Sequence, residues 1–386
     1  MAVTITASGD AEEVDNTIVD IDEIQAHGIS AVDITKLKMN NIHTVGMLVG
    51  TSTRRLVRIK GITEQKAEKM KEAAKKVAVG FLPTSSTLPA DTLQAPGTGG
   101  TFITAAELGH VRKKCLRIST GSKQLDACLN GGFQTMSISE VYGEFSASGC
   151  GKTQLAHTMA VIAQLPKELG GADGKVAYIG RQQFPPRPQI PKGPFDQKES
   201  QRLLRDSEVR RPCSPSFRHI LTRPVDPEQA CENIVYARAQ NTEMQQEMLE
   251  GLAQSFATNE YRLLIVDSIM ALFRTDYIGR GELSDRQCAL NQFLRKATQM
   301  AEEFNLVVLM TNQVMSDPGA SALFAGVDGR KPAGGHVLAH ASTTRILLRK
   351  GRGEERVAKV VDSPDCPEAE ATYIITNGGI NDPEKA

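Results

Sequence analysis

The sequence has no tryptophan, only 5% aromatic residues among 386, and no apolar run long enough to cross a bilayer. Its mean hydropathy is −0.26. The first residues also lack the basic and then apolar pattern of a secretory signal, so we expect an intracellular protein with no membrane partner. The seven cysteines contain no CxxC pair, which argues against a zinc site and against a disulfide framework.

A net charge is missing too, because 45 Lys and Arg balance 45 Asp and Glu. By itself this balance argues against a nucleic-acid partner. However, ten of the basic residues and only four of the acidic ones lie in the segment 181–224. The rest of the chain is therefore net acidic, and any DNA contact must come from a few local arginines.

Composition divides the chain into four parts. Residues 1–23 are acidic and poor in apolar residues, so we expect a disordered tail. Residues 24–77 contain short amphipathic patterns and predict a small all-helical domain. Residues 78–101 are rich in Pro, Gly, Ser and Thr and predict a linker to the large domain, 102–386.

One turn of the helical domain has two possible interpretations. Residues 59–62 read Ile-Lys-Gly-Ile between two helical stretches, the layout of a helix-hairpin-helix whose backbone N–H groups bind phosphate. An ordinary turn between helices fits this tetrapeptide equally well. The second helix is expected to start after Thr63, a good N-cap residue.

The large domain alternates strand-like and helical patterns. Short apolar runs such as SISEVYGEF, VAYIG, YRLLIVDS and NLVVLMTNQ are separated by long helical stretches. This alternation predicts an α/β fold with a parallel sheet and a ligand at the carboxyl edge of the strands.

A phosphate-binding loop is expected at residues 143–153, GEFSASGCGKT, between a strand pattern and a helix pattern. In such P-loops the backbone wraps the phosphates, a Lys contacts their oxygens and a Thr ligates Mg²⁺. Lys152 and Thr153 take these roles. The spacing is irregular, because Ser146 stands where the first Gly belongs and Gly143 comes three positions too early.

Two other strand ends carry candidate residues. Asp267 closes LLIVDS, where P-loop enzymes place a carboxylate of the magnesium shell. Without the GKT triplet, a buried strand ending at an Asp-Ser turn would explain it equally. Asn312 and Gln313 close NLVVLMTNQ and are placed to sense a γ-phosphate by hydrogen bonding, or else simply to terminate a strand.

Four long blocks closely resemble the eukaryotic RecA-like strand-exchange recombinases, most of all their meiosis-specific branch. The blocks are GKTQLAHTMA, LLIVDSIMALFRTDYIGRGELSDRQ, MTNQVMSDPGASALFAGVDGRKPAGGHVLAHAS and LLRKGRGEERVAKVVDSPDCPEAEATYIITNGGI. The resemblance covers 24–77 and nearly all of 102–179 and 225–386. It implies a RecA-like P-loop ATPase core with a small helical N-terminal domain. The implied function is an ATP-dependent filament on single-stranded DNA that performs homologous pairing and strand exchange in meiotic recombination and double-strand break repair.

The same resemblance implies the site residues. ATP and Mg²⁺ are the implied cofactors, and Thr153 and Asp267 the implied metal ligands. The implied catalytic set is Lys152, Thr153, Asp267 and Gln313. The implied nucleotide contacts are Gly143, Gly149, Gly151, Lys152, Thr153, Gln154 and, as a cap on a neighbour's adenine, Pro364.

DNA and partner contacts follow in the same way. Two glycine-containing loops, 274–286 and about 314–340, are the implied DNA loops, although solvated surface loops are the alternative for each. The implied DNA contacts are Arg274, Tyr277, Arg280, Arg286 and Arg356. Phe102 and Ala105 match the polymerisation motif that plugs pockets on a neighbouring protomer, although an ordinary buried strand also fits. The implied partners are single- and double-stranded DNA, further copies in a filament or ring, and recombination mediators, in the nucleus.

The chain departs from the family after VAYIG. The family continues with DTEGTFRPER, whose Glu polarises the attacking water, whereas Gln182 occupies that aligned position here. The segment 181–224 holds 8 of the 18 prolines and the basic excess described above. We expect it to be a disordered, aberrant insertion.

The genetic code suggests a hypothesis for the origin of this insertion. Residues 189–208 can be back-translated with allowed codons so that the frame starting at the third base reads DTEGTFRPERIAEIAERFG, the missing family block. The flanking codons can be written as splice donors and acceptors. We therefore interpret 181–224, and the extra phosphate-loop residues at 146–149, as splicing errors. The chain as written is expected to hydrolyse ATP weakly or not at all.

Two other function classes compete with the recombinase. A non-catalytic RecA-like mediator that binds DNA and recombinase partners would tolerate the missing Glu. A hexameric P-loop helicase shares the core but offers no reason for the helical N-terminal domain. The polymerisation motif and both DNA loops favour the recombinase.

Overall fold

The computed structural model describes residues 18–80, 105, 109, 112–143, 149–180, 227–279, 281–316, 330–376 and 378–383. Most of the expected tail and linker, and all of the segment 181–224, lie outside these residues, so the expected disorder of that segment is untested. The helices are η1 (Ile21–His27), α1 (Ala31–Met39), α2 (Val45–Gly50), α3 (Thr53–Val57), α4 (Glu64–Gly80), α6 (Lys123–Cys128), α7 (Lys152–Ile162), η3 (Lys167–Leu169), α10 (Pro227–Glu232), α11 (Thr242–Phe256), α12 (Ile269–Asp276), α13 (Leu283–Glu303) and α14 (Gly335–Ala341). In the described ranges, none of them is both long and apolar enough to span a bilayer.

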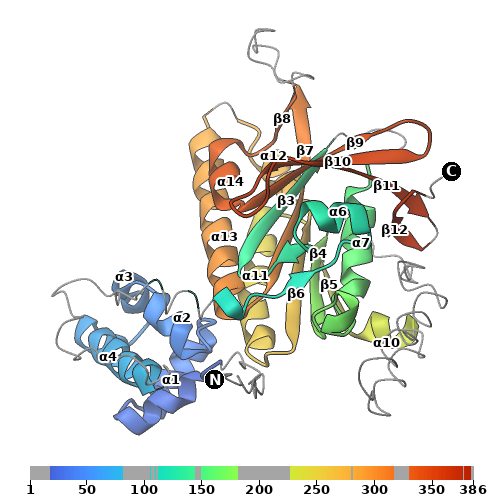
Figure 1. Ribbon diagram of the computed structural model, residues 1–386. Coiled ribbons are helices and arrows are strands. Elements are labelled where there is room, and N and C mark those ends of the chain that lie inside the picture. Colours follow the sequence, from blue (N-terminus) through green and yellow to red (C-terminus); the bar gives the residue numbers. More distant parts are fainter. Residues whose placement is uncertain are drawn as a thin grey trace, which may run out of the picture.

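The strands are β1 (Arg117–Ile118), β2 (Phe133–Gln134), β3 (Ser137–Gly143), β4 (Lys175–Gly180), β5 (Ile234–Arg238), β6 (Tyr261–Asp267), β7 (Val307–Ser316), β8 (Arg330–Pro332), β9 (Thr344–Lys350), β10 (Glu355–Asp362), β11 (Glu370–Thr376) and β12 (Gly379–Asn381). The main sheet has the order β12-β11-β10-β9-β3-β7-β6-β4-β5, with β8 paired to β7 (Figure 1). Six neighbouring strands of this sheet run parallel as expected, namely β9, β3, β7, β6, β4 and β5. Strands β10, β11 and β12 extend the sheet beyond β9 with antiparallel pairs. The expected α/β fold is thus confirmed with an antiparallel extension.

Helices cover both faces of this sheet, so its central strands are buried on both sides. Along β7, Val307 and Leu309 pack with α7 on one face, whereas Val308 and Met310 pack with α11 and α13 on the other. This alternation arises because successive side chains of a strand point to opposite faces. It explains why the strand patterns read as continuous apolar runs.

The N-terminal elements η1 and α1 to α4 form a separate bundle with its own apolar core. This domain starts before residue 24, the start expected from composition, because Ile21 is fully buried in that core. The acidic tail is therefore shorter than 1–23. At the other end α4 continues to Gly80, beyond the expected boundary at residue 77. Thr63 caps α4 as expected, since its Oγ1 accepts from the Lys66 N–H at 3.4 Å.

The turn between α3 and α4 is tight and left-handed at Gly61, with φ +88°. Ile59 and Ile62 flank it and are buried, so their side chains anchor the turn in the helical core. Lys36 lies over the turn, with its Nζ 3.0 Å from the position that a Cβ on Gly61 would take. An amine beside exposed backbone suits a phosphate, but it suits an ordinary turn as well, and the two interpretations stay open.

The bundle packs on the core domain through α2 and α13 (Figure 1). The Thr44 hydroxyl donates to the Glu303 carboxylate at 2.6 Å, and Arg55 pairs with Glu250 at 3.1 Å. Gly46 lies so close that an ideal Cβ there would be 2.1 Å from Glu303 Oε2. Burial raises the pKa of Glu303, although Thr44 and Lys296 oppose the shift.

This interface should respond to pH. A carboxyl group whose pKa is raised by folding stabilises the docked form fully below its unfolded value, and that contribution is lost as pH rises through the folded value. We expect Glu303→Gln, which keeps an oxygen for Thr44, to remove this loss and raise the melting temperature by a few degrees at neutral pH. Melting curves from pH 4 to 8 measure it, with exposed Glu243→Gln as the control. A parallel pH dependence in wild type and Glu303→Gln would contradict the assignment.

Candidate nucleotide site and its surroundings

The phosphate loop joins β3 to α7 at the carboxyl edge of the sheet. Gly151 precedes α7 with a left-handed φ of +92°, which a side chain would strain. The Lys152 ammonium crosses the loop and donates to the Gly143 carbonyl at 2.9 Å. Gly143 itself tolerates no side chain, because a Cβ would lie 2.3 Å from the carbonyl oxygen of Leu348. Ser146 lies outside the described residues.

Hydroxyl groups surround Asp267 at the carboxyl end of β6. The carboxylate accepts from Thr153 Oγ1 at 2.8 Å, from Tyr178 OH at 2.9 Å and from Thr311 Oγ1 at 2.5 Å. The structure thus brings together Thr153 and Asp267, which lie 114 positions apart in the sequence. Both supply the hard oxygen ligands that Mg²⁺ prefers, so these residues fit the expected metal.

Tyr178 is a part of this cluster that sequence reasoning missed. Burial, and then the Asp267 carboxylate, raises the pKa of Tyr178 well above its usual value, so the phenol remains a donor. Its ring lies 5.7 Å from that of His157. Burial lowers the pKa of His157, so its imidazole is neutral at pH 7. The pattern VAYIG predicted a strand, but nothing in it indicated that the Tyr faces Asp267.

Tyr178 therefore offers a sharp test of the metal site. Tyr178→Phe removes one hydrogen bond to the Asp267 carboxylate, and bonds to charged groups contribute about 1.5–3 kcal/mol. We expect the Mg²⁺ concentration for half-maximal binding of a fluorescent ATP analogue to rise roughly tenfold. Tyr261→Phe, at the opposite end of β6, is the matched control. Equal Mg²⁺ curves for both variants would show that Tyr178 does not orient the ligand.

The back of the phosphate loop is held by β10 and β11. Tyr373 OH donates to the Cys150 carbonyl at 2.6 Å, and Arg356 Nε donates to the Gly149 carbonyl at 3.3 Å. Arg356 is only 8% exposed. Its guanidinium is thus buried against the phosphate loop of this chain, and the DNA contact stays a prediction. Gln154 lies in the first turn of α7, where its carbonyl accepts from Thr158 at 2.8 Å.

The predicted first DNA loop, 274–286, begins within α12. Arg274 Nη1 donates to Gln313 Oε1 at 3.3 Å, so the two predicted residues meet. Tyr277 stacks on Phe273 with ring centroids 6.4 Å apart, which makes it partly a packing residue. Arg286 lies in the first turn of α13, and its Nε has no hydrogen-bond partner within the described structure. Arg280 lies outside the described residues.

The predicted second DNA loop, about 314–340, includes regular elements at both of its ends. Residues up to Ser316 belong to β7, residues 330–332 form β8, and α14 begins at Gly335. Val314 pairs with Pro332 in an antiparallel ladder, so backbone pairing extends both arms. Residues 317–329 lie outside the described part of the chain.

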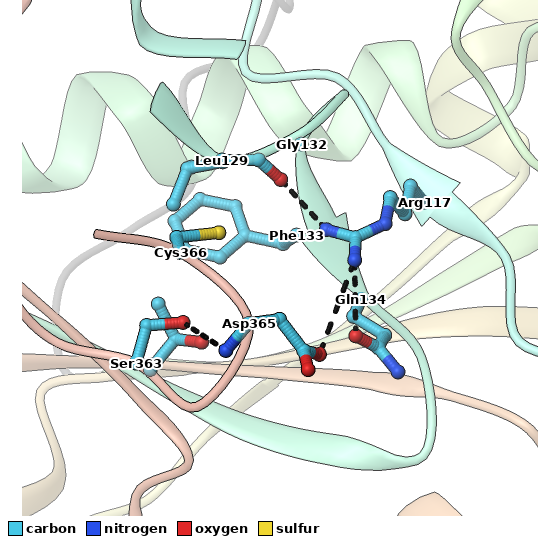
Figure 2. Close-up of a pocket in the computed structure, with 9 residues that line it drawn as sticks. Arg117, Leu129, Gly132, Phe133, Gln134, Ser363, Asp365 and Cys366 are labelled. Carbon is cyan, nitrogen blue, oxygen red and sulfur yellow. Dashed lines mark hydrogen bonds and ion pairs between the residues drawn. The ribbon is translucent and has the colours of Figure 1, made fainter. Parts of the chain in front are cut away.

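A small pocket lies beside the loop that carries Pro364. Arg117 donates to the Leu129 carbonyl at 2.6 Å and lies 4.0 Å from the Asp365 carboxylate (Figure 2). Asn130 Nδ2 donates to the Asp365 carbonyl at 2.9 Å. The pocket encloses about 10 Å³, room for one water molecule, so a nucleotide base does not fit there. Pro364 itself is exposed, as a cap on a neighbour requires.

Of the two residues predicted to mediate polymerisation, the structure describes only Ala105. Ala105 is helical and exposed, and Phe102 lies outside the described residues. Gln182, which we predicted to stand in the place of the family's Glu, also lies outside them.

In a comparison with known proteins, the model of the Rad51 family matches residues 111–189 and 218–383, which are more than half of the chain. The unmatched residues 190–217 fall inside the segment 181–224, although the match extends a few residues further into that segment at both ends than we expected. Meiotic recombination protein DMC1 of Saccharomyces cerevisiae is 47% identical over 381 residues, 98% of this chain and 99% of that protein. Meiotic recombination protein DLH1 of Candida albicans is 49% identical over 370 residues, with 96% and 99% covered.

The similarity extends to animals. The human meiotic recombination protein DMC1/LIM15 homolog is 42% identical over 376 residues, 97% of this chain and 96% of that protein. The matches therefore span both the helical domain and the α/β core. The family match covers the core, the relatives match over nearly their full length, and Thr153 of the phosphate loop contacts Asp267. The chain therefore belongs to the Rad51 family.

Proposed function

We propose that this chain is an ATP-dependent DNA strand-exchange recombinase of meiotic recombination, which also serves double-strand break repair. The observation that carries the proposal is the contact of Thr153 with Asp267, beside a Lys152 that reaches back across the phosphate loop. Arg274 of the first DNA loop meets Gln313 at the same edge of the sheet. Nucleotide and DNA would thus be bound by adjacent parts of one edge.

Different residues of the chain have different roles at the nucleotide. In the chain as written, Gly149, Gly151 and the N-terminus of α7 would present backbone N–H groups to phosphate, and Lys152 would neutralise its charge. Thr153 and Asp267 would hold Mg²⁺, which offsets the phosphate charges when it is bound. Tyr178 keeps Asp267 oriented. Gln313 would report the γ-phosphate to Arg274, to which it is hydrogen-bonded.

DNA binding would come from the loop arginines rather than from overall charge. Arg274, Arg280 and Arg286 lie within or beside the first loop and supply phosphate contacts. Ile278 in that loop is 83% exposed, which leaves an apolar side chain free to contact bases. Repeating such loops along a filament converts weak single contacts into strong binding.

Assembly would use both ends of the core domain. Phe102 and Ala105 are proposed to bind a neighbouring protomer. Among the described strands β5 is the outermost of its side of the sheet, and Val235 on it is 43% exposed. An open strand edge of this kind accepts an added strand. Pro364 would cap the neighbour's nucleotide, and mediators of recombination in the nucleus would act on the assembled form.

Electron microscopy with single-stranded DNA and ATP tests the proposal. We expect helical filaments from the wild type, and small complexes from Phe102→Glu, which places a charge in an apolar pocket. Rings that persist with DNA would favour the helicase-like architecture. DNA-bound small complexes from the wild type would favour the alternative, a non-catalytic mediator, which the missing family Glu near Gln182 would suit.

A further inference from the structure

A buried charge lies at the centre of the sheet, next to the nucleotide site but outside it. Glu140 in β3 is completely buried. Its Oε2 accepts from Arg345 Nε at 2.8 Å, and its Oε1 accepts from Asn312 Nδ2 at 2.7 Å. The Arg345 guanidinium also lies over the Tyr142 ring, 5.5 Å from its centroid. Three neighbouring strands, β3, β7 and β9, are thereby joined by one carboxylate.

This arrangement contributes little to stability compared with an apolar core. Removing two charges from water costs more than their attraction usually returns, and apolar residues of equal volume often stabilise a protein equally well or better. A buried pair fixes geometry instead, because each partner has only one favourable position. The question is which geometry Glu140 fixes.

Asn312 connects Glu140 to the base of the second DNA loop. Its Nδ2 also donates to the Ala333 carbonyl at 2.7 Å, and its Oδ1 accepts from the Gln313 N–H at 2.8 Å. Ala333 in turn donates its N–H to the Gln313 carbonyl at 2.9 Å. Asn312 is fully buried, and these bonds engage both the nitrogen and the oxygen of its side-chain amide.

Ala333 is where the chain leaves the second loop. Gly334 follows with φ +101°, and α14 starts at Gly335. The Gly334 carbonyl accepts from Gln287 Nε2 at 3.4 Å, and Gln287 lies beside Arg286 at the start of α13. The base of the second loop is therefore tied to the first loop's helix on one side and, through Asn312, to Glu140 on the other.

Glu140 also lies three residues before Gly143, whose carbonyl accepts the Lys152 ammonium. A shift of β3 caused by phosphate in the loop would move Glu140, and Glu140 would move Asn312 and Ala333 with it. We propose that Glu140 is a positioning residue that couples nucleotide occupancy of the phosphate loop to the conformation of the second DNA loop. This inference rests on the proposed function.

The carboxylate is chemically required for this role. Both partners of Glu140 are donors, and a carboxylate accepts from both. A glutamine of the same shape has one acceptor and one donor. Glu140→Gln therefore breaks one of the two bonds and turns an N–H toward another donor, while it leaves the phosphate loop residues unchanged.

The test compares single-stranded DNA affinity of the full chain in the presence of a non-hydrolysable ATP analogue and of ADP. The ratio of the two affinities measures coupling, which usually lies between about 5- and 150-fold. In E140Q we expect this ratio to fall about tenfold or to near one, with affinity for the ATP analogue within about twofold of wild type. The double variant E140Q/R345Q lets the two amides pair with each other and frees an acceptor for Asn312, so it should recover part of the ratio.

The control is E370Q, which breaks the 2.8 Å ion pair between Glu370 and Arg349 on the surface of the same sheet. This variant should leave the ratio unchanged. An unaltered ratio in E140Q would overturn the inference, as would an equal loss of affinity in both nucleotide states. A wild-type ratio of one, in a protein shown to bind the ATP analogue, would instead refute nucleotide-controlled DNA binding, and with it the proposed function. If E140Q does not fold, amide hydrogen exchange at residues 333–338 of the wild type provides the test. We expect this exchange to differ between the ATP analogue and ADP, and equal exchange in the two states would refute the coupling.

Discussion

Restoring the displaced reading frame is expected to raise DNA-stimulated ATP hydrolysis by roughly 10²- to 10⁴-fold, the usual contribution of a positioned catalytic base. The restored chain replaces residues 181–224 with DTEGTFRPERIAEIAERFG and residues 146–149 with a single Arg. The first change supplies the Glu that polarises water in this family. The second places Gly143 at the first glycine of a regular GxxxxGKT loop, so that the backbone closes around phosphate.

Each part of that change has its own measurement. Phosphate release is compared for the chain as written, for each replacement alone and for both together. A restored chain whose new Glu is changed to Gln should again be inactive, since its loop is regular but its base is absent. Equal turnover by the chain as written and by the restored chain would refute the hypothesis.

The transcript provides an independent check. Sequencing of the cDNA should show spliced messages that lack the codons for residues 181–188 and 209–224. Messages that uniformly retain these codons would mean that the segment is real protein, and its ten basic residues would then have to be reconsidered as a DNA contact.

Removal of the Lys152 ammonium should have the second large effect. Lys152→Ala deletes a charge-assisted bond to phosphate, which contributes about 1.5–3 kcal/mol, and we expect affinity for a fluorescent ATP analogue to fall roughly 10- to 150-fold. The backbone carbonyl of Gly143, which accepts this ammonium at 2.9 Å, loses its partner too. Lys75→Ala, on the exposed face of α4, makes the same substitution far from the loop and should bind normally.

The outcome separates two explanations of the irregular loop. If the extra residues prevent the loop from forming a phosphate site, Lys152→Ala and wild type will bind the analogue equally weakly. If the loop forms around Lys152, only the variant loses affinity. Isothermal titration of both proteins with and without Mg²⁺ distinguishes the two cases.

Much of the α/β core was predictable from sequence because its strands are short, apolar and separated by helices. Asp267 and Gln313 were singled out in the same way, since each stands at the carboxyl end of a strand pattern, although β7 continues past Gln313 to Ser316. The antiparallel strands β10 to β12 escaped prediction, because half-buried strands of alternating character near the end of the chain give no sign of which edge they join. The start of the helical domain was placed too late because Ile21 stands among acidic residues and looks like part of the tail.

Arg356 shows why single side chains are harder to place. Its neighbours in GRGEER are charged and indicate an exposed loop, yet it is buried behind the phosphate loop. Its role depends on β10 pairing with β9 in one register, and a shift of one residue would turn the side chain to the other face. Local patterns carry no information about such a register.

The sequence by itself determined the class of protein: a phosphate loop, a strand-end aspartate and long blocks of a recombinase family, all of which are local in the chain. The tertiary structure alone decided that Tyr178 and Thr311 bind Asp267, that Glu303 closes the contact between the domains, and that Glu140 meets Asn312, 172 positions away. The physical reason is that these contacts arise from strand order and from the packing of buried polar groups. Periodicity encodes which face a residue takes, but it does not encode which distant residue it meets there.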